Sequence, residues 1–142
     1  MEDPTEFQLI KGYENLYKIN RNGDIWSCIY QKVMKPQLSK DGYLWVKLTK
    51  EKVNHKGRIH RLLGLQYIEN TENLPQIDHI DRNKLNNALD NLRWVTHTDN
   101  MRNKANYKDN LTEEQKEQKV QDLKEYKRKR IYGRKRTDEI KE

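Results

Sequence analysis

The chain has 142 residues, which is enough for one small domain with extensions or for two small modules. Hydrophobic residues make up only 33% and charged residues 36%, and the mean hydropathy is −1.26, so we expect a small core and extended surface segments. The net charge of +7 is typical of a protein with a polyanionic partner, most often nucleic acid. A solvated basic surface would have the same charge balance, so charge alone does not decide between these two interpretations.

Several classes of protein are disfavoured by the same inventory. A single cysteine, Cys28, allows neither a disulfide within the chain nor a zinc site made of clustered thiolates, so we expect no structural zinc. The N-terminal segment is acidic and lacks the apolar core of a signal peptide. No apolar run approaches the roughly 20 residues that a membrane-spanning helix needs. We therefore expect a soluble, intracellular protein with no membrane partner.

Residues 1–69 are expected to form a β-rich N-terminal module. Asn22-Gly23 and Asp41-Gly42 each separate two strand-like runs and predict β-hairpins, because residues of these types tolerate the positive φ of tight turns. The runs flanking the two turns cover residues 17–20, 25–30, 33–36 and 43–48.

The end of this module is expected to change from strand to helix. Residues 53–59 predict a further strand. Residues 59–68 carry an apolar stripe at helical spacing and predict a short helix.

Residues 70–106 predict a strand, a polar loop, a second strand and a helix in close succession. The strands are expected at residues 77–80 and 92–95, and the Asn- and Asp-rich residues 81–90 form the loop. Thr96 is expected to cap a helix from about residue 97 to residue 104, with Asp99 three positions on.

Residues 107–142 are expected to form a charged helical tail. Thr112 and Gln115 have the spacing of a capping box, and the Glu-, Lys- and Gln-rich stretch to about residue 130 favours a helix. Residues 127–136 form a basic cluster. The predicted fold class is therefore α+β, with a β-rich module, a ββα motif and a charged C-terminal helix.

The chemistry of the chain is expected at the end of the strand that contains Asp78 and His79. Neighbouring strand residues point to opposite faces, so these two can serve one site only where the strand ends. Histidine can take a proton from water near neutral pH, and a hard divalent cation prefers carboxylate and amide oxygens. A helix packed back across the two strands can bring Asn100 beside Asp78. These are the groups that phosphodiester hydrolysis requires.

The stretch from Asp78-His79, through the polar loop and residues 91–96, to Asn100 resembles the HNH, or ββα-metal, nuclease motif of phage intron homing endonucleases. The resemblance implies that Asp78 and Asn100 bind one catalytic Mg²⁺ or Mn²⁺ and that His79 is the general base. It implies that Asn91, the middle asparagine, holds the loop and the base in place.

The resemblance covers roughly residues 10–104, and relatives use the N-terminal module for DNA contacts. Two features of many relatives are absent. There is no four-cysteine zinc site. A charged helix is expected where larger phage enzymes continue into a helix-turn-helix module, which puts recognition of a specific DNA sequence in doubt.

Further contacts to nucleic acid are expected from basic residues around the motif and in the tail. A solvated tail is an equally good interpretation of the basic cluster, and His60 is expected to be a packed rather than a catalytic histidine. The candidate nucleic-acid-binding residues are Lys84, Arg93, Arg102, Lys127, Arg128, Lys129 and Arg130.

The sequence thus predicts a monomeric endonuclease that nicks duplex DNA, acting in the cytoplasm of a bacterial host if the gene belongs to a phage. Two alternatives remain open. The chain could be a non-catalytic nucleic-acid-binding protein on an HNH scaffold, or a nuclease subunit that joins a larger complex through its C-terminal helix.

Overall fold

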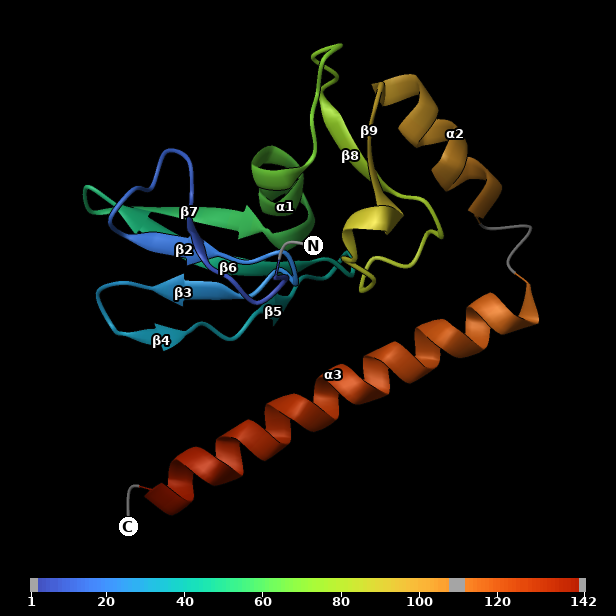
Figure 1. Ribbon diagram of the computed structural model, residues 1–142. Coiled ribbons are helices and arrows are strands. Elements are labelled where there is room, and N and C mark those ends of the chain that lie inside the picture. The colour runs from blue at the N-terminus through green and yellow to red at the C-terminus, as the bar shows by residue number, and fades with distance from the viewer. Residues whose placement is uncertain (1–2, 108–111, 141–142) are drawn as a thin grey trace.

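The computed structural model describes the backbone of residues 3–107 and 112–140 and the side chains of residues 3–103 and 112–128. Three small antiparallel sheets and three α-helices follow one another along the chain, which confirms the predicted α+β class (Figure 1). The two N-terminal sheets lie on one side, and the third sheet with its helix lies beside them.

The first sheet contains four short strands in sequence order: β1 (Gln8–Leu9), β2 (Tyr17–Ile19), β3 (Ile25–Ser27) and β4 (Lys32–Val33). The hairpin predicted at Asn22-Gly23 is confirmed and joins β2 to β3. The side-chain oxygen of Asn20 accepts hydrogen bonds from the backbone N–H groups of Asn22 and Asp24, at 3.1 and 2.9 Å. Gly23 has a φ of +84°, which glycine adopts at little cost. The side-chain hydrogen bonds of Asn20 and the conformational freedom of Gly23 therefore both stabilise this turn.

The second sheet contains β5 (Gln37–Leu38), β6 (Leu44–Lys50) and β7 (Val53–Arg58). The turn at Asp41-Gly42 is confirmed, but the prediction that residues 33–36 form its first strand is wrong. Val33 pairs with Trp26 in the first sheet, and β5 takes the place opposite β6. Pro36 lies between them and has no backbone N–H to donate, so it separates the two pairings.

The main core lies where helix α1 (Ile59–Tyr67) meets both N-terminal sheets. Strand β7 confirms the strand predicted at residues 53–59, and α1 confirms the helix predicted at residues 59–68. Side chains from the first sheet, from β6 and from α1 pack together here and are almost completely buried. The most deeply buried apolar members are Ile19, Ile25, Val46, Leu48 and Leu63.

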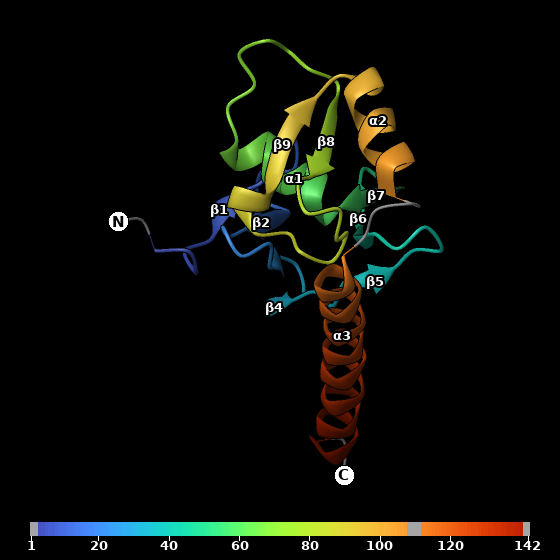
Figure 2. The same cartoon turned by 90° about the vertical axis from the view of Figure 1, so that its right-hand side faces the viewer.

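The third unit contains β8 (Gln76–His79), the 3-10 helix η1 (Leu89–Asn91), β9 (Leu92–Val95) and helix α2 (His97–Tyr107). Strands β8 and β9 are antiparallel, so the predicted order of strand, loop, strand and helix is confirmed. The hydroxyl of Thr96 accepts a hydrogen bond from the N–H of Asp99 at 3.1 Å, as a helix cap does. Figure 2 shows α2 lying alongside β8.

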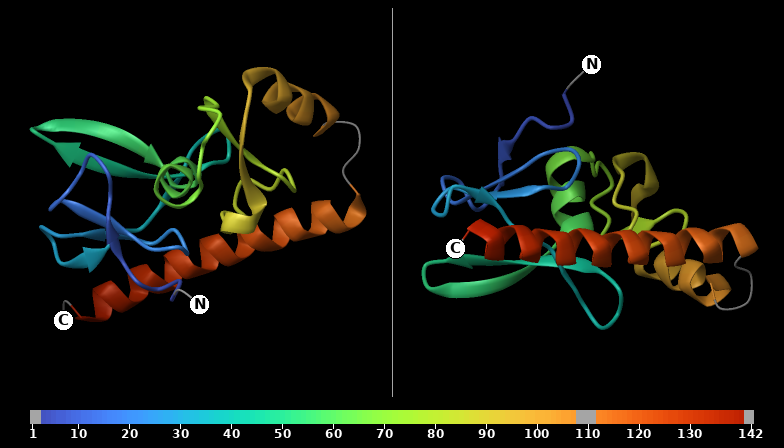
Figure 3. Two further views of the ribbon diagram at one scale, coloured as in Figure 1. Left: turned by 45° about the horizontal axis from the view of Figure 1, so that its top comes forward. Right: turned by 90° about the horizontal axis from the view of Figure 1, so that it is seen from below.

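Helix α3 (Glu113–Ile140) runs along one side of the body and extends beyond the end predicted near residue 130 (Figure 3). Its capping box is confirmed, since Thr112 and Gln115 exchange hydrogen bonds of 3.1 and 3.2 Å. The hydroxyl of Tyr126 donates to the carbonyl of Pro36 at 2.9 Å, and Asp122 accepts a hydrogen bond from Asn83. Within the described residues, no helix combines the length and the apolar character that crossing a bilayer demands.

Helix α1 packs against strand β8 at Gly64, which lies next to Ile77. A β-carbon at this position would lie 2.9 Å from Cγ1 of Ile77 and would also overlap Cδ1 of that side chain. The absence of a side chain at residue 64 therefore permits the close approach of helix and strand.

We expect Gly64→Ala to destabilise the protein by about 1–3 kcal/mol, because overpacking outweighs the better helix propensity of alanine. Denaturant titration measures the change, and Leu65→Ala, at an exposed neighbour in the same helix, is the control. Adding Ile77→Val should restore part of the loss, since it removes Cδ1. A Gly64→Ala protein as stable as the parent would contradict this packing.

Candidate active site

The candidate site is at the end of β8, where the chain turns away from the sheet. Asp78 and His79 are the last two residues of the strand, and these residues are only 7% and 4% exposed. The N–H of Arg82 donates to the carbonyl of His79 at 2.9 Å and closes the turn. The expectation that the pair lies at a strand end is therefore confirmed.

Asp78 carries a buried carboxylate with two donors on a single oxygen. Oδ2 accepts hydrogen bonds from Nδ2 of Asn103 at 2.7 Å and from Nη2 of Arg93 at 3.2 Å. Among the described residues, none donates a hydrogen bond to Oδ1. The arrangement keeps the charged carboxylate compensated and leaves one oxygen for a ligand.

The imidazole of His79 is held in one tautomer. Its Nε2 lies 2.8 Å from Oδ1 of Asn87, and because an amide oxygen only accepts, Nε2 carries the proton. Nδ1 is then the basic nitrogen. Burial lowers the pKa of His79, although the hydrogen bond to Asn87 acts in the opposite direction. The ring is therefore neutral at neutral pH and can accept a proton.

Two aromatic rings from the N-terminal module stack towards this base. The ring centroids of Tyr43 and His60 are 4.9 Å apart, and those of His60 and His79 are also 4.9 Å apart. His60 is 7% exposed, and burial, followed by the charge of His79, lowers its pKa to about 3. His60 is thus a packed histidine, as expected, but one that touches the base. Nothing local in the sequence indicated this contact or the role of Asn87.

Asn91 lies inside the polar loop and makes several hydrogen bonds there. Its Nδ2 donates to Oδ1 of Asp81 at 2.9 Å and to the carbonyl of Asn86 at 2.8 Å, and its Oδ1 accepts from the N–H of Asp81 at 3.0 Å. The carbonyl of Asn91 also accepts from the N–H of Ile80 at 2.8 Å. Asn91 therefore holds the loop, whereas the side chain that contacts His79 is that of Asn87.

The structure brings Asn103, rather than Asn100, to the carboxylate of Asp78. Nδ2 of Asn100 donates to Oε1 of Gln76 at 2.6 Å. Gln76 and Asp78 lie on one face of β8, and Asn100 and Asn103 lie on one face of α2. Two hydrogen bonds therefore join the helix to the strand, one from Asn100 to Gln76 and one from Asn103 to Asp78. The contact of Asn103 with Asp78 was not predicted from the sequence, although Asn103 lies three residues after Asn100, a spacing that places both on one face of a helix.

The predicted nucleic-acid-binding residues lie in four different settings. Nζ of Lys84 is 4.7 Å from the ring centroid of Tyr43 and donates to the carbonyl of Asp41, close to His79. Arg93 contacts Asp78, and Arg102 is exposed on α2. The remaining four belong to α3: Lys127 and Arg128 are exposed, and the side chains of Lys129 and Arg130 lie outside the described residues.

The oxygen donors at this site fit a hard divalent cation. Oδ1 of Asp78 and Oδ1 of Asn100 accept no hydrogen bond from the described residues, and carboxylate and amide oxygens are the ligands that Mg²⁺ prefers. Within residues 3–103 and 112–128, no three His, Cys, Asp or Glu side chains form a metal-binding group. A cation held by Asp78 and Asn100 alone would have positions left for water and substrate.

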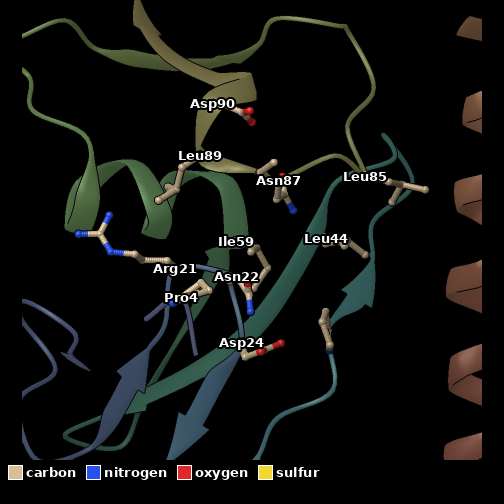
Figure 4. Close-up of a pocket in the computed structure, with 13 residues that line it drawn as sticks. Pro4, Arg21, Asn22, Asp24, Leu44, Ile59, Leu85, Asn87, Leu89 and Asp90 are labelled. Atoms are coloured by element: carbon tan, nitrogen blue, oxygen red, sulfur yellow. The ribbon is translucent and has the colours of Figure 1, made fainter. Parts of the chain in front are cut away.

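A pocket of about 610 Å³ lies on the other side of the polar loop (Figure 4). It separates the turn that contains Asn22 and Asp24 from Leu85 and Asn87 of the loop. Asn87 lines it, whereas Asp78 and His79 do not. The pocket therefore borders Asn87, the hydrogen-bond partner of His79, and is distinct from the candidate site.

Comparison with known proteins points to one family. The model of a family described as HNH endonuclease matches residues 58–102. An uncharacterized HNH endonuclease, L245, of Acanthamoeba polyphaga mimivirus is 44% identical over 87 residues, which cover 61% of this chain and 26% of that protein. The DNA endonuclease I-HmuI of Bacillus phage SP01 is 39% identical over 98 residues, covering 69% of this chain and 56% of that protein. The chain thus spans between a quarter and just over half of these relatives.

A solved structure agrees with this result. It is described as DNA binding and cleavage by the HNH homing endonuclease I-HmuI, and it matches with a TM-score of 0.65 and 34% sequence identity. The match covers 85% of this chain and 68% of that chain, so it extends well beyond the residues matched by the family model.

The low pKa of His60 predicts a loss of stability in acid. The folded protein disfavours protonation at His60 until about pH 3, whereas the unfolded chain protonates it near the ordinary value of 6.5. Stability from this group is therefore complete above pH 6.5 and is lost as the pH falls towards 3. Between about pH 7.5 and about pH 5, the loss should be roughly 2 kcal/mol.

Replacing His60 with Gln should remove this part of the acid sensitivity, as measured by denaturant titrations at the two pH values. His55→Gln, at an exposed position, serves as the control and should keep the parental pH dependence. An unchanged dependence in His60→Gln would show that other groups cause the loss.

Proposed function

Because this chain belongs to the HNH endonuclease family, we propose that it is a metal-dependent DNA endonuclease with Asp78 and His79 at its reaction centre. The observation that carries the proposal is the position of a buried carboxylate and a buried neutral imidazole at the end of one strand. A second strand and a helix support both groups, as the ββα arrangement requires.

In the proposed reaction, Nδ1 of His79 takes a proton from a water molecule as that water attacks the scissile phosphorus. A bond forms between the water oxygen and phosphorus, and the bond from phosphorus to the 3′ oxygen breaks. The leaving oxygen takes up a proton from solvent. The products carry 5′-phosphate and 3′-hydroxyl ends.

Asp78 and Asn100 would hold one Mg²⁺ or Mn²⁺ at this centre. When bound, such an ion stabilises negative charge on the phosphate and on the leaving oxygen. Asp78 contributes Oδ1, because its Oδ2 already accepts two hydrogen bonds. Arg93, with a half-exposed side chain, is suited to move from Asp78 to an incoming phosphate.

Duplex DNA would reach this site along an exposed face of the second sheet, here called the basic face and made of Trp45, Lys47, Lys56 and Arg58. Lys47 lies opposite Lys56, and Trp45 lies opposite Arg58, in the β6–β7 register. The neighbouring side chains of Val46 and Leu48 point into the core, which leaves the basic face to solvent.

The basic face continues directly into the candidate site. The guanidinium carbon of Arg58 is 4.8 Å from the ring centroid of Tyr43, and that ring is 6.0 Å from His79. A backbone bound along the face would therefore run towards the base. One such site cuts one strand per binding event, so the monomer should nick duplex DNA.

The direct test is incubation of the purified chain with supercoiled plasmid and Mg²⁺ or Mn²⁺. We expect open circles to appear before linear product, no product with EDTA, and a loss of about 10²- to 10⁴-fold for His79→Ala. His55→Ala is the matched histidine control and should cut normally. Activity that survives both His79→Ala and Asp78→Ala would contradict the assignment of these residues to the reaction centre. Salt-sensitive binding to DNA without cleavage would favour a non-catalytic protein.

The basic face gives a second expected outcome. Lys47→Ala with Lys56→Ala should weaken binding to duplex DNA in EDTA and should reduce the slope of log affinity against log salt by about two, one for each lost phosphate contact. Fluorescence anisotropy at several salt concentrations measures both quantities. The charge-matched control, Lys32→Ala with Lys35→Ala, changes exposed residues outside the basic face. Equal salt slopes for the two double variants would place the DNA elsewhere.

A further inference from the structure

Asn103 connects the proposed metal-binding carboxylate to a residue outside the predicted site. Its Nδ2 donates to Oδ2 of Asp78 at 2.7 Å and lies 3.4 Å from the carbonyl of His79. Its Oδ1 accepts a hydrogen bond from Nε of Arg82 at 2.8 Å. Both ends of the amide are therefore engaged.

Arg82 and Asp78 together fix which way the amide of Asn103 points, because a guanidinium only donates hydrogen bonds and a carboxylate only accepts them. A guanidinium group has donors only, so it requires the oxygen of Asn103 on its side. The NH₂ group of Asn103 must then face the carboxylate of Asp78. In this orientation Asn103 donates a hydrogen bond to Asp78, and the side-chain oxygen of Asn103 is occupied by Arg82.

The backbone at Arg82 adopts a conformation that glycine forms more easily than arginine. Arg82 has a φ of +65°, a left-handed conformation that costs a residue with a side chain about 1 kcal/mol and costs glycine almost nothing. Glycine would make this turn more easily but could not reach Asn103. Replacing Arg82 with glycine therefore removes the guanidinium without adding strain to the backbone.

We infer that Asn103 and Arg82 are positioning residues for Asp78. Arg82 orients Asn103, and Asn103 occupies Oδ2 of Asp78, so that Oδ1 is presented to the cation. Outer partners of this kind orient metal ligands in proteins, and their removal typically weakens metal binding about 10- to 100-fold. The inference rests on the proposed function, because it assumes that Asp78 binds the metal.

The experiment measures Mn²⁺ affinity of the full chain by electron paramagnetic resonance, together with the midpoint of denaturant unfolding. Asn103→Leu removes the amide at similar size, and Arg82→Gly removes the guanidinium while relieving the left-handed backbone. Both variants should bind Mn²⁺ about tenfold or more weakly. Arg82→Gly should also keep or raise the unfolding midpoint. A purely structural role predicts the opposite, namely lower stability with unchanged metal affinity.

Two controls make the outcome specific. Lys52→Gly removes a basic side chain at nearly the same φ, +66°, in the β6–β7 turn and should leave Mn²⁺ affinity unchanged. The double variant Arg82→Gly/Asn103→Leu should bind Mn²⁺ no more weakly than Asn103→Leu alone, because Arg82 acts through Asn103. Additive losses, or affinities within twofold of the parent, would overturn the inference.

Asp78→Ala separates this inference from the proposed function. If Asp78→Ala retains Mn²⁺ binding, the proposed metal site itself is wrong. If Asp78→Ala loses binding while Asn103→Leu keeps it, the metal site stands and the positioning role fails.

Discussion

The buried carboxylate of Asp78 is the constraint around which the rest of the site is organised. A charge removed from water must be compensated by nearby donors, and a carboxylate that is also to bind a cation must keep one oxygen available. The structure compensates the charge by directing Arg93 and Asn103 to Oδ2, which leaves Oδ1 for the cation that we propose. These two residues come from β9 and α2, so the ββα unit must be assembled before the carboxylate is compensated.

The ββα unit alone does not form the surroundings of His79, the proposed base. The imidazole of His79 is buried against His60, and His60 is stacked on Tyr43, so two residues from the N-terminal module complete its surroundings. Burial of both imidazoles lowers both pKa values, which keeps the base neutral and makes folding sensitive to acid. The N-terminal module therefore combines two tasks, since it exposes the basic face and also forms one wall around His79.

Helix α3 extends this cooperation to the C-terminal part of the chain. Asp122 contacts Asn83 of the polar loop, and Tyr126 contacts Pro36 between the two N-terminal sheets. A single helix therefore touches both the loop that supports the base and the link between the sheets. Both of these contacts are polar, in keeping with the charged composition of this helix.

The sequence by itself determined the features that depend on neighbouring residues. The turns at Gly23 and Gly42, the cap at Thr96 and the position of Asp78 and His79 at a strand end follow from φ preferences, short hydrogen bonds and strand periodicity. Only the tertiary structure decided which distant side chains meet. It brought His60 to His79 and Asn103 to Asp78, and it placed β5 in the position predicted for residues 33–36. These contacts depend on how α1, α2 and the sheets pack together, because helix rotation and strand pairing are decided by the buried surface of the whole molecule.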